Sequence, residues 1–180
     1  MTDIGKQFTI TLAPVGIVRS SLKTPIPPPT DDIIDPAEQK ERVRVFRNKL
    51  KNIVAEIVIN QDLEGLLEGI EGFSHVLVLF WPHLISSEKR TVRRVHPMGR
   101  KDFPKQGVFA TCSPARPNPV LVSAVELVRR KANVLYVKGL DAVDGTPVID
   151  IKPYVDGYHR VEKSNVPDWM RRLHEEIEGD

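Results

Sequence analysis

The sequence has one cysteine, Cys112, among 180 residues. A single cysteine forms no intramolecular disulfide and no multi-cysteine zinc site, so both kinds of scaffold are excluded. No apolar run reaches the roughly 18–20 residues that a membrane-spanning helix needs. Residues 1–16, MTDIGKQFTITLAPVG, have no basic region followed by an apolar stretch, so we expect no signal peptide. We therefore expect a cytoplasmic protein that is not embedded in a membrane.

A strong charge of one sign is also missing. The 26 Lys and Arg residues nearly balance 24 Asp and Glu residues, which leaves a formal charge of +2. The overall balance therefore indicates no partner, and only local clusters of charge can do so. The five histidines lie singly, without Cys or carboxylate neighbours at ligand spacing, so we expect no metal.

The residues that are present predict one mainly β domain. With 41% hydrophobic residues, the chain can bury one sizeable core. Short alternating or β-branched segments predict strands, and the connections between most of them are too short for crossover helices. We therefore expect an antiparallel, closed or nearly closed β-barrel with peripheral short helices and a C-terminal helix. The predicted strands are 8–12, 15–20, 42–46, 52–59, 75–81, 107–111, 121–128, 133–140 and 147–151.

Two segments predict helices. DLEGLLEGIEG, residues 62–72, predicts a short helix with Gly69 or Gly72 near its end. Residues 166–179 predict a longer helix with Pro167 in its first turn. Its apolar residues Trp169, Met170, Leu173 and Ile177 recur at helical spacing, which favours packing or stabilisation of a dimer. We expect a barrel domain at 1–156 and a helical extension at 157–180.

Two stretches depart from ordinary barrel sequence through proline or charge. Residues 22–37, LKTPIPPPTDDIIDPA, contain five prolines and three aspartates, so we expect an extended loop, either a plain surface connection or part of a site. Residues 89–105 contain seven Lys or Arg residues against one acid, Asp102. This basic segment is either a solvated loop or a phosphate-binding surface.

Two further motifs concentrate polar groups. CSPARPNPV, residues 112–120, places Arg116 and Asn118 among three prolines, and such a rigid loop suits the wall of a ligand site. GLDAVDGTPVIDIKPY, residues 139–154, has a turn at Asp144–Gly145, but a turn alone does not explain its other charged groups.

These motifs, with GIEGFSHVLVLFWPH before them and VGIVRS near the start, resemble the TsaA-like family. Its characterised members are the tRNA N6-threonylcarbamoyladenosine methyltransferases, also called TrmO. The resemblance covers roughly residues 14–156. It implies an antiparallel barrel that binds S-adenosylmethionine as methyl donor, forms a homodimer with the donor near the subunit boundary, and acts on the anticodon loop of tRNA.

The resemblance also implies a set of site residues. Matching positions and the rigid loop together give a site for S-adenosylmethionine made of Pro28, Pro29, Thr30, His83, Leu84, Cys112, Arg116, Asn118, Val122, Ala142, Val143, Asp144 and Gly145. The basic segment would then bind RNA through Lys89, Arg90, Arg93, Arg94, Arg100 and Lys101. Removal of the proton from N6 needs a base, for which Asp144 and His75 are the candidates. Asp144 has the alternative role of closing its turn.

The chain departs from the family pattern where Cys112 replaces an arginine, where Val120–Leu121 replaces isoleucine–glycine, and in the early proline-rich loop. Two other functions therefore stay open. The chain could be a module that binds S-adenosylmethionine without this tRNA activity, or a methyltransferase for another substrate.

Overall fold

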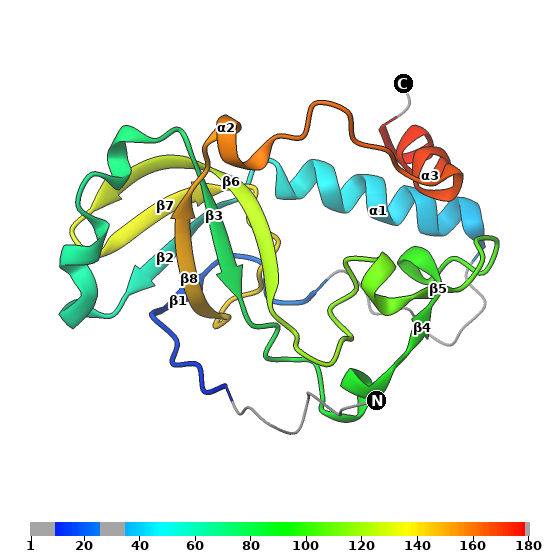
Figure 1. Ribbon diagram of the computed structural model, residues 1–180, viewed down its shortest axis with the longest axis horizontal. Coiled ribbons are helices and arrows are strands. Elements are labelled where there is room, and N and C mark those ends of the chain that lie inside the picture. The colour runs from blue at the N-terminus through cyan, green and yellow to red at the C-terminus, as the bar shows by residue number, and fades with distance from the viewer. Residues whose placement is uncertain (1–9, 26–34, 179–180) are drawn as a thin grey trace.

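The computed structural model describes residues 10–25 and 35–178, and its centre is a closed six-stranded antiparallel barrel (Figure 1). The strands follow one another around the barrel in the order β1-β2-β7-β6-β3-β8. The predicted antiparallel barrel is thereby confirmed. The strands are β1 (Gly16–Arg19), β2 (Val54–Ile59), β3 (His75–Phe80), β6 (Leu121–Lys131), β7 (Val134–Lys138) and β8 (Pro147–Pro153).

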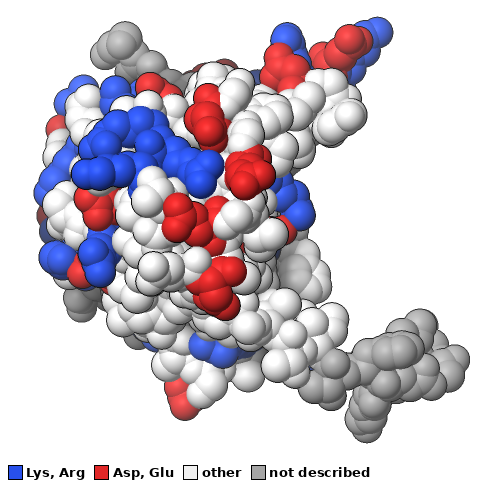
Figure 2. Space-filling view, turned by 90° about the vertical axis from the view of Figure 1, so that its left-hand side faces the viewer, with Lys and Arg blue, Asp and Glu red and all other residues white. Residues whose placement is uncertain are grey.

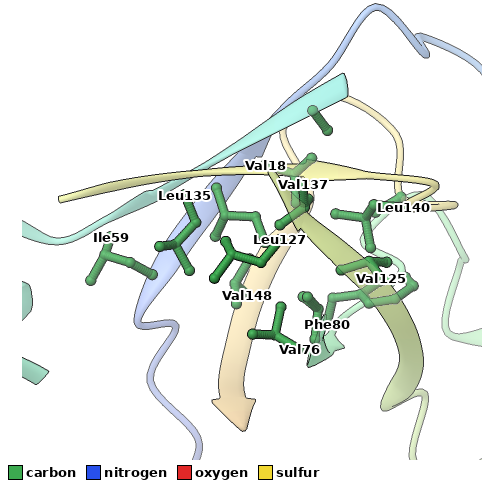
Figure 3. Close-up of a cluster of buried hydrophobic side chains, with 14 of the residues drawn as sticks. Val18, Ile59, Val76, Phe80, Val125, Leu127, Leu135, Val137, Leu140 and Val148 are labelled. Atoms are coloured by element: carbon green, nitrogen blue, oxygen red, sulfur yellow. The ribbon is translucent and has the colours of Figure 1, made fainter. Parts of the chain in front are cut away.

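Alternating side chains fill the barrel. In β3, Val76, Val78 and Phe80 are at most 2% exposed, whereas the residues between them face outward or are half-buried. This is the period of two that a pleated strand imposes. Figure 3 shows the inward side chains meeting in one cluster. The first position of β1 requires glycine, because a Cβ at Gly16 would lie 2.4 Å from the carbonyl oxygen of Val58 on the neighbouring strand.

One strand prediction is wrong: RVRVF, residues 42–46, lies within helix α1 (Pro36–Leu50). The Asp35 side chain accepts a hydrogen bond of 3.3 Å from the Glu38 N–H, which caps the helix start, and proline occupies the first turn. Among residues 37–50 of the helix, Gln39 and Val43 are buried, and their spacing of four is helical. The alternation of Arg and Val coincided with a strand pattern only over five residues.

Two other predicted strands are also corrected. Residues 10–12 of FTITL form no strand, and residues 8 and 9 lie outside the described chain. In GVFAT only Gly107 belongs to a strand, because residues 108–110 form the 3₁₀ turn η6 (Val108–Ala110). Gly107 belongs to a hairpin of two short strands, β4 (Arg94–Val95) and β5 (Gln106–Gly107).

The predicted helices are confirmed. Residues 61–72 form two 3₁₀ helices, η2 (Gln61–Leu67) and η3 (Ile70–Gly72), separated at Gly69, whose φ of 79° suits glycine. The C-terminal helix is α3 (Asp168–Glu178), and a short helix α2 (Asp156–His159) precedes it. The division into domains at residue 156 stays a prediction.

Helices α1 and α3 and the β4–β5 hairpin lie together beside the barrel (Figure 1). We call residues 36–51, 88–107 and 168–178 the helical lobe. Val43 of α1, Phe103 of the hairpin and Leu173 of α3 are each at most 6% exposed, so every part of the lobe buries an apolar side chain. The hairpin is flanked by the 3₁₀ turn η4 (Glu88–Thr91) and contains η5 (Pro97–Gly99).

Across residues 10–25 and 35–178, no helix is long and apolar enough to cross a bilayer. The same residues contain no group of three or more His, Cys, Asp or Glu side chains placed to hold a metal ion.

Candidate functional site

Most of the predicted cofactor residues gather at one end of the barrel. Strands β1 and β3 end there and β6 and β8 begin there, because β8 pairs antiparallel with both β1 and β3, and β3 pairs antiparallel with β6. The segment after Phe80, the start of β6 at Leu121 and the turn before Pro147 are therefore neighbours. The antiparallel pairing thus brings together segments that lie far apart in the sequence.

Backbone hydrogen bonds fix the turn before β8. The Gly145 N–H donates to the Val18 carbonyl at 2.9 Å, and the Asp144 N–H donates to the Leu22 carbonyl at 2.7 Å. Gly145 has a φ of 78°, which is strained for any residue with a side chain. Its Cα also lies close to His83, because an added Cβ would meet the His83 Nε2 atom at 3.8 Å. The turn and the imidazole therefore form one surface.

His83 and Thr146 place two polar side chains next to each other at this end. Thr146 is only 1% exposed, and its Oγ1 lies 3.5 Å from Nδ1 of His83. The His83 residue itself is exposed. A buried hydroxyl beneath an exposed imidazole orients the ring and leaves its other nitrogen available to a ligand. Sequence reasoning missed Thr146, since Asp-Gly-Thr-Pro is already explained as a turn.

Asp144 is held at the same end by two donors. Its carboxylate accepts a hydrogen bond from the Ser20 N–H at 2.9 Å and pairs with Lys23 Nζ at 2.8 Å. The Lys23 side chain, followed by the Ser20 N–H, lowers the pKa of Asp144 below its usual range. The carboxylate is therefore ionised at neutral pH and is a weak base. This geometry favours the turn-closing role that the sequence left open.

His75 lies at the opposite end of β3. It pairs in register with Glu126, and its Nδ1 lies 2.9 Å from Ser74 Oγ. A six-residue strand is about 17–20 Å long. Within one chain, His75 and Asp144 therefore do not share a site, and the structure separates the two candidate bases.

The loop 112–120 is braced by Arg116. Its guanidinium donates to the backbone carbonyls of Ser113 at 2.9 Å, Val108 at 3.3 Å and Thr111 at 2.5 Å. Three backbone acceptors use most of the donors of one arginine, so the side chain serves the loop. The loop runs directly into β6, whose first residue pairs with Phe80. Cys112 is exposed beside this brace.

The other residues predicted to bind S-adenosylmethionine lie at several places around this end of the barrel. Val122 lies on the outside of β6, opposite Leu79, and is 62% exposed. Leu84 is 56% exposed after β3, while Ala142 and Val143 are buried in the turn that leads to Gly145. The Asn118 carbonyl accepts the Val120 N–H within the braced loop. Pro28, Pro29 and Thr30 lie outside the described residues.

The structure divides the predicted RNA-binding residues into two groups. Arg100 is 7% exposed, pairs with Asp102 and Glu176, and stacks over Phe103, so its charge is enclosed. Arg90 lies over Trp81 at 5.1 Å and donates to the Ile85 carbonyl. The exposed members are Lys89, Arg93, Arg94 and Lys101, and Arg94 also donates to the Lys105 carbonyl.

A shallow hollow of about 350 Å³ lies between the basic segment and the braced loop. Arg93 and Phe109 line it, and Phe109 is 81% exposed. An exposed aromatic ring beside a guanidinium can stack on a flat, electron-rich ring. The remaining lining residues are Thr91, Val92, Gly107, Val108, Ala110 and Pro117.

Residues 37–159 match the family model of the tRNA-methyltransferase O N-terminal domain, TrmO_N. The chain belongs to this family. The match begins at the second residue of α1, includes the hairpin and every barrel strand except β1, and ends with α2, before α3.

Individual relatives agree with this assignment. The chain is 42% identical over 147 residues to a probable S-adenosyl-L-methionine-binding protein of Methanothermobacter thermautotrophicus, covering 82% of this chain and 91% of the relative. It is 37% identical over 117 residues to the tRNA (adenine(37)-N6)-methyltransferase of Mus musculus, covering 65% of this chain and 27% of that protein. The crystal structure of TrmO from Pseudomonas aeruginosa superposes with a TM-score of 0.62 at 28% identity, covering 88% of this chain and 62% of that one.

The chain thus spans most of the archaeal relative, under two thirds of the solved bacterial structure and about a quarter of the mouse protein.

Proposed function

We propose that the chain binds S-adenosylmethionine at the barrel end beside His83 and Gly145 and transfers its methyl group to tRNA, at N6 of threonylcarbamoyladenosine in the anticodon loop. Membership of the TrmO_N family carries this proposal. The names of the archaeal and mouse relatives support both the donor and the RNA substrate.

The residues at the barrel end fit such a donor, which would supply an electrophilic methyl group on a sulfonium. The glycine at position 145 allows a ligand to approach the backbone closely, and the exposed His83 ring, oriented by Thr146, offers a hydrogen-bonding nitrogen. The nearby Asp144 carboxylate is ionised and tolerates a positive charge beside it. The braced loop 112–120 loses little entropy on binding, because Arg116 already holds it.

Of the two candidate bases, Asp144 is the one that lies at the donor end. Its lowered pKa makes it a weak proton acceptor, since an efficient base has a pKa near the working pH. We propose that Asp144 acts mainly through its negative charge and its hold on the turn. Replacement by Asn would then weaken donor binding more than it lowers kcat at saturating donor.

The exposed cations of the basic segment would bind the phosphates of the anticodon arm. Arg93 belongs both to this group and to the hollow that contains Phe109. Unstacked RNA bases stack on aromatic rings and on guanidinium planes. We propose that the hollow receives a base of the anticodon loop while Lys89 and Lys101 neutralise its backbone.

We also propose that the chain forms a homodimer through the outer face of β3 and β6. The register pairs Leu77 with Ala124 and Leu79 with Val122, which gives this face four apolar side chains. Val122 is 62% exposed, and an apolar patch on a sheet face is typical of an interface. A second copy of the same face would cover it. Sedimentation of V122D as a monomer, with wild type as a dimer, is the expected result, and a monomeric wild type would contradict it.

Calorimetry with S-adenosylmethionine followed by mass spectrometry of incubated tRNA tests the main proposal. We expect donor binding and a mass gain of one methyl group on threonylcarbamoyladenosine. Donor binding without any gain would favour a binding module, which the exposed, uncharged Cys112 at an arginine position supports. A gain on another RNA or protein would assign a different substrate, and no donor binding would refute the proposal.

A further inference from the structure

Positive charge is concentrated in the helical lobe. The lobe contains 15 Lys and Arg residues against 8 Asp and Glu residues, whereas the rest of the chain has 11 against 16. Outside the lobe, the residues that the structure describes have 10 Lys and Arg against 12 Asp and Glu, so the excess of positive charge is concentrated in the lobe. Figure 2, which views the molecule from the barrel side, shows basic and acidic side chains in neighbouring areas there. An excess of positive charge in one part of the molecule creates a directional field for a polyanion.

Helix α1 contributes a basic stripe that the sequence alone did not indicate. Lys40, Arg44, Arg47 and Lys51 recur at spacings of four, three and four, which places them along one side of the helix. Gln39 and Val43 occupy the adjoining buried side. Glu41, one turn before Arg44 on the same helix, pairs with it at 2.8 Å. The stripe is about 16 Å long at 1.5 Å per residue.

Contacts within the lobe hold this stripe at a fixed position relative to the basic hairpin. The Gln39 side chain of α1 donates to the Met98 carbonyl at 3.1 Å. Arg100 of the hairpin pairs with Glu176 of α3, and α3 packs against α1. The hairpin and the helix are therefore held in a fixed relative position.

We propose that the α1 stripe and the exposed hairpin cations together form one surface, which docks the phosphate backbone of a double-stranded RNA stem. The inference rests on the proposed function, in which the barrel end receives the substrate base. Two basic elements on a rigid lobe suit the closely spaced phosphates of a duplex. An anionic membrane fits less well, because a membrane-surface helix exposes a broad apolar face, and α1 turns its buried side toward the lobe.

The stem docks on the lobe through charge, so its contribution to tRNA affinity can be measured separately from that of the single-stranded loop. The test compares K40Q/R44Q/K51Q with R129Q/K131Q/K138Q, which removes the same formal charge from β6 and β7 of the barrel. Glutamine retains helix propensity, and circular dichroism verifies that both variants fold. Fluorescence anisotropy measures binding of full-length tRNA and of a short single-stranded anticodon-loop RNA from 50 to 200 mM salt.

We expect the α1 variant to bind full-length tRNA at least tenfold more weakly, with a salt slope lower by about 2 to 3, because each lost phosphate contact removes about 0.9. Its affinity for the short RNA and for S-adenosylmethionine stays at the wild-type value, and KM for tRNA rises while kcat is kept. An α1 variant that matches wild type, or a control that loses as much, overturns the inference. If wild type itself binds no tRNA, both the docking surface and the proposed function are refuted. If wild type methylates tRNA and the α1 variant binds tRNA as wild type does, only the docking surface is refuted.

Discussion

Arg100 in the hairpin pairs with Glu176 in the C-terminal helix, although the two residues lie 76 positions apart. Arg172 donates to the same Glu176 carboxylate at 3.0 Å and to Asp102 at 3.1 Å, which closes a ring of four charges. The guanidinium carbons of Arg100 and Arg172 lie 4.5 and 4.6 Å from the Phe103 ring centroid. The ring of four charges joins α3 to the basic segment 89–105. The basic segment lies within the family match, whereas α3 lies beyond it.

Replacing Glu176 by Ala should loosen the lobe. Arg100 keeps Asp102 but loses one of its two carboxylate partners while it stays buried, so we expect a loss of about 1–3 kcal/mol in the free energy of unfolding. Urea denaturation measures this loss, and hydrogen exchange should show faster exchange at residues 94–107. The exposed neighbour Glu175 provides the control, because E175A should stay within about 0.5 kcal/mol of wild type. Equal stability of the two variants would contradict the role of the ring.

Stability should fall in acid partly through the same ring. The hydrogen bond from Arg100 is the largest cause that lowers the pKa of Asp102 and of Glu176. A carboxyl group whose pKa is lower in the folded state stabilises the fold above its unfolded pKa of about 4, and this contribution is lost as the pH falls. We expect D102N/E176Q to lose less stability than wild type between pH 6 and pH 3. If the urea midpoints of wild type and D102N/E176Q change in parallel with pH, the ring of four charges does not contribute to the loss of stability in acid.

The exposed and the enclosed arginines of the basic segment should behave differently. K89Q/R93Q/K101Q should weaken tRNA binding and lower its salt slope by about 2 to 3, with donor affinity unchanged. R100Q should instead lower the unfolding midpoint, because Arg100 is enclosed by Asp102, Glu176 and Phe103. Anisotropy titrations at several salt concentrations, beside thermal denaturation, distinguish the two outcomes. An unchanged slope for the triple variant would remove the basic segment from the RNA surface.

Donor binding should depend on His83 and on the threonine beneath it. We expect H83A to raise the Kd for S-adenosylmethionine about tenfold, which corresponds to about 1.4 kcal/mol, the worth of one hydrogen bond. T146V keeps the side-chain shape but removes the hydroxyl that lies 3.5 Å from the imidazole. We expect it to raise the Kd for S-adenosylmethionine less than H83A does. Calorimetry measures both values. H174A, at an exposed position on α3, is the control and should bind the donor as wild type does.

The barrel should not tolerate a methyl group at its first strand. In G16A the new Cβ would lie 2.4 Å from the Val58 carbonyl oxygen, which belongs to the backbone of the paired strand and cannot rotate away. We expect a loss of about 2–4 kcal/mol in the free energy of unfolding. G107A has no neighbouring atom within 4 Å of the added Cβ and should stay near wild type. A stable G16A protein would mean that β1 is paired differently.

Local pattern in the sequence determined the barrel strands. HVLVLF is a continuous apolar run and VAEIVI is rich in β-branched residues. Short segments of these two kinds predict strands, which β3 and β2 confirm. The pattern failed in RVRVF because five residues are too few to distinguish a strand from a helix, and in the helix Val43 is buried while Val45 is 55% exposed. The signal that decides the helix, Asp35 followed by proline and helix-forming residues, lies outside that window.

The residues of the candidate site also fall into two groups, those that the sequence indicated and those that only the tertiary structure placed. Sequence motifs indicated His83, Gly145 and the rigid loop, since glycine at a turn and clustered prolines carry their backbone constraints with them. Only the tertiary structure placed Thr146 beneath His83, paired Asp144 with Lys23, enclosed Arg100 and moved His75 to the far end of β3. These relationships depend on strand register and helix packing, which join residues 63 to 124 positions apart and leave no periodic pattern in the sequence.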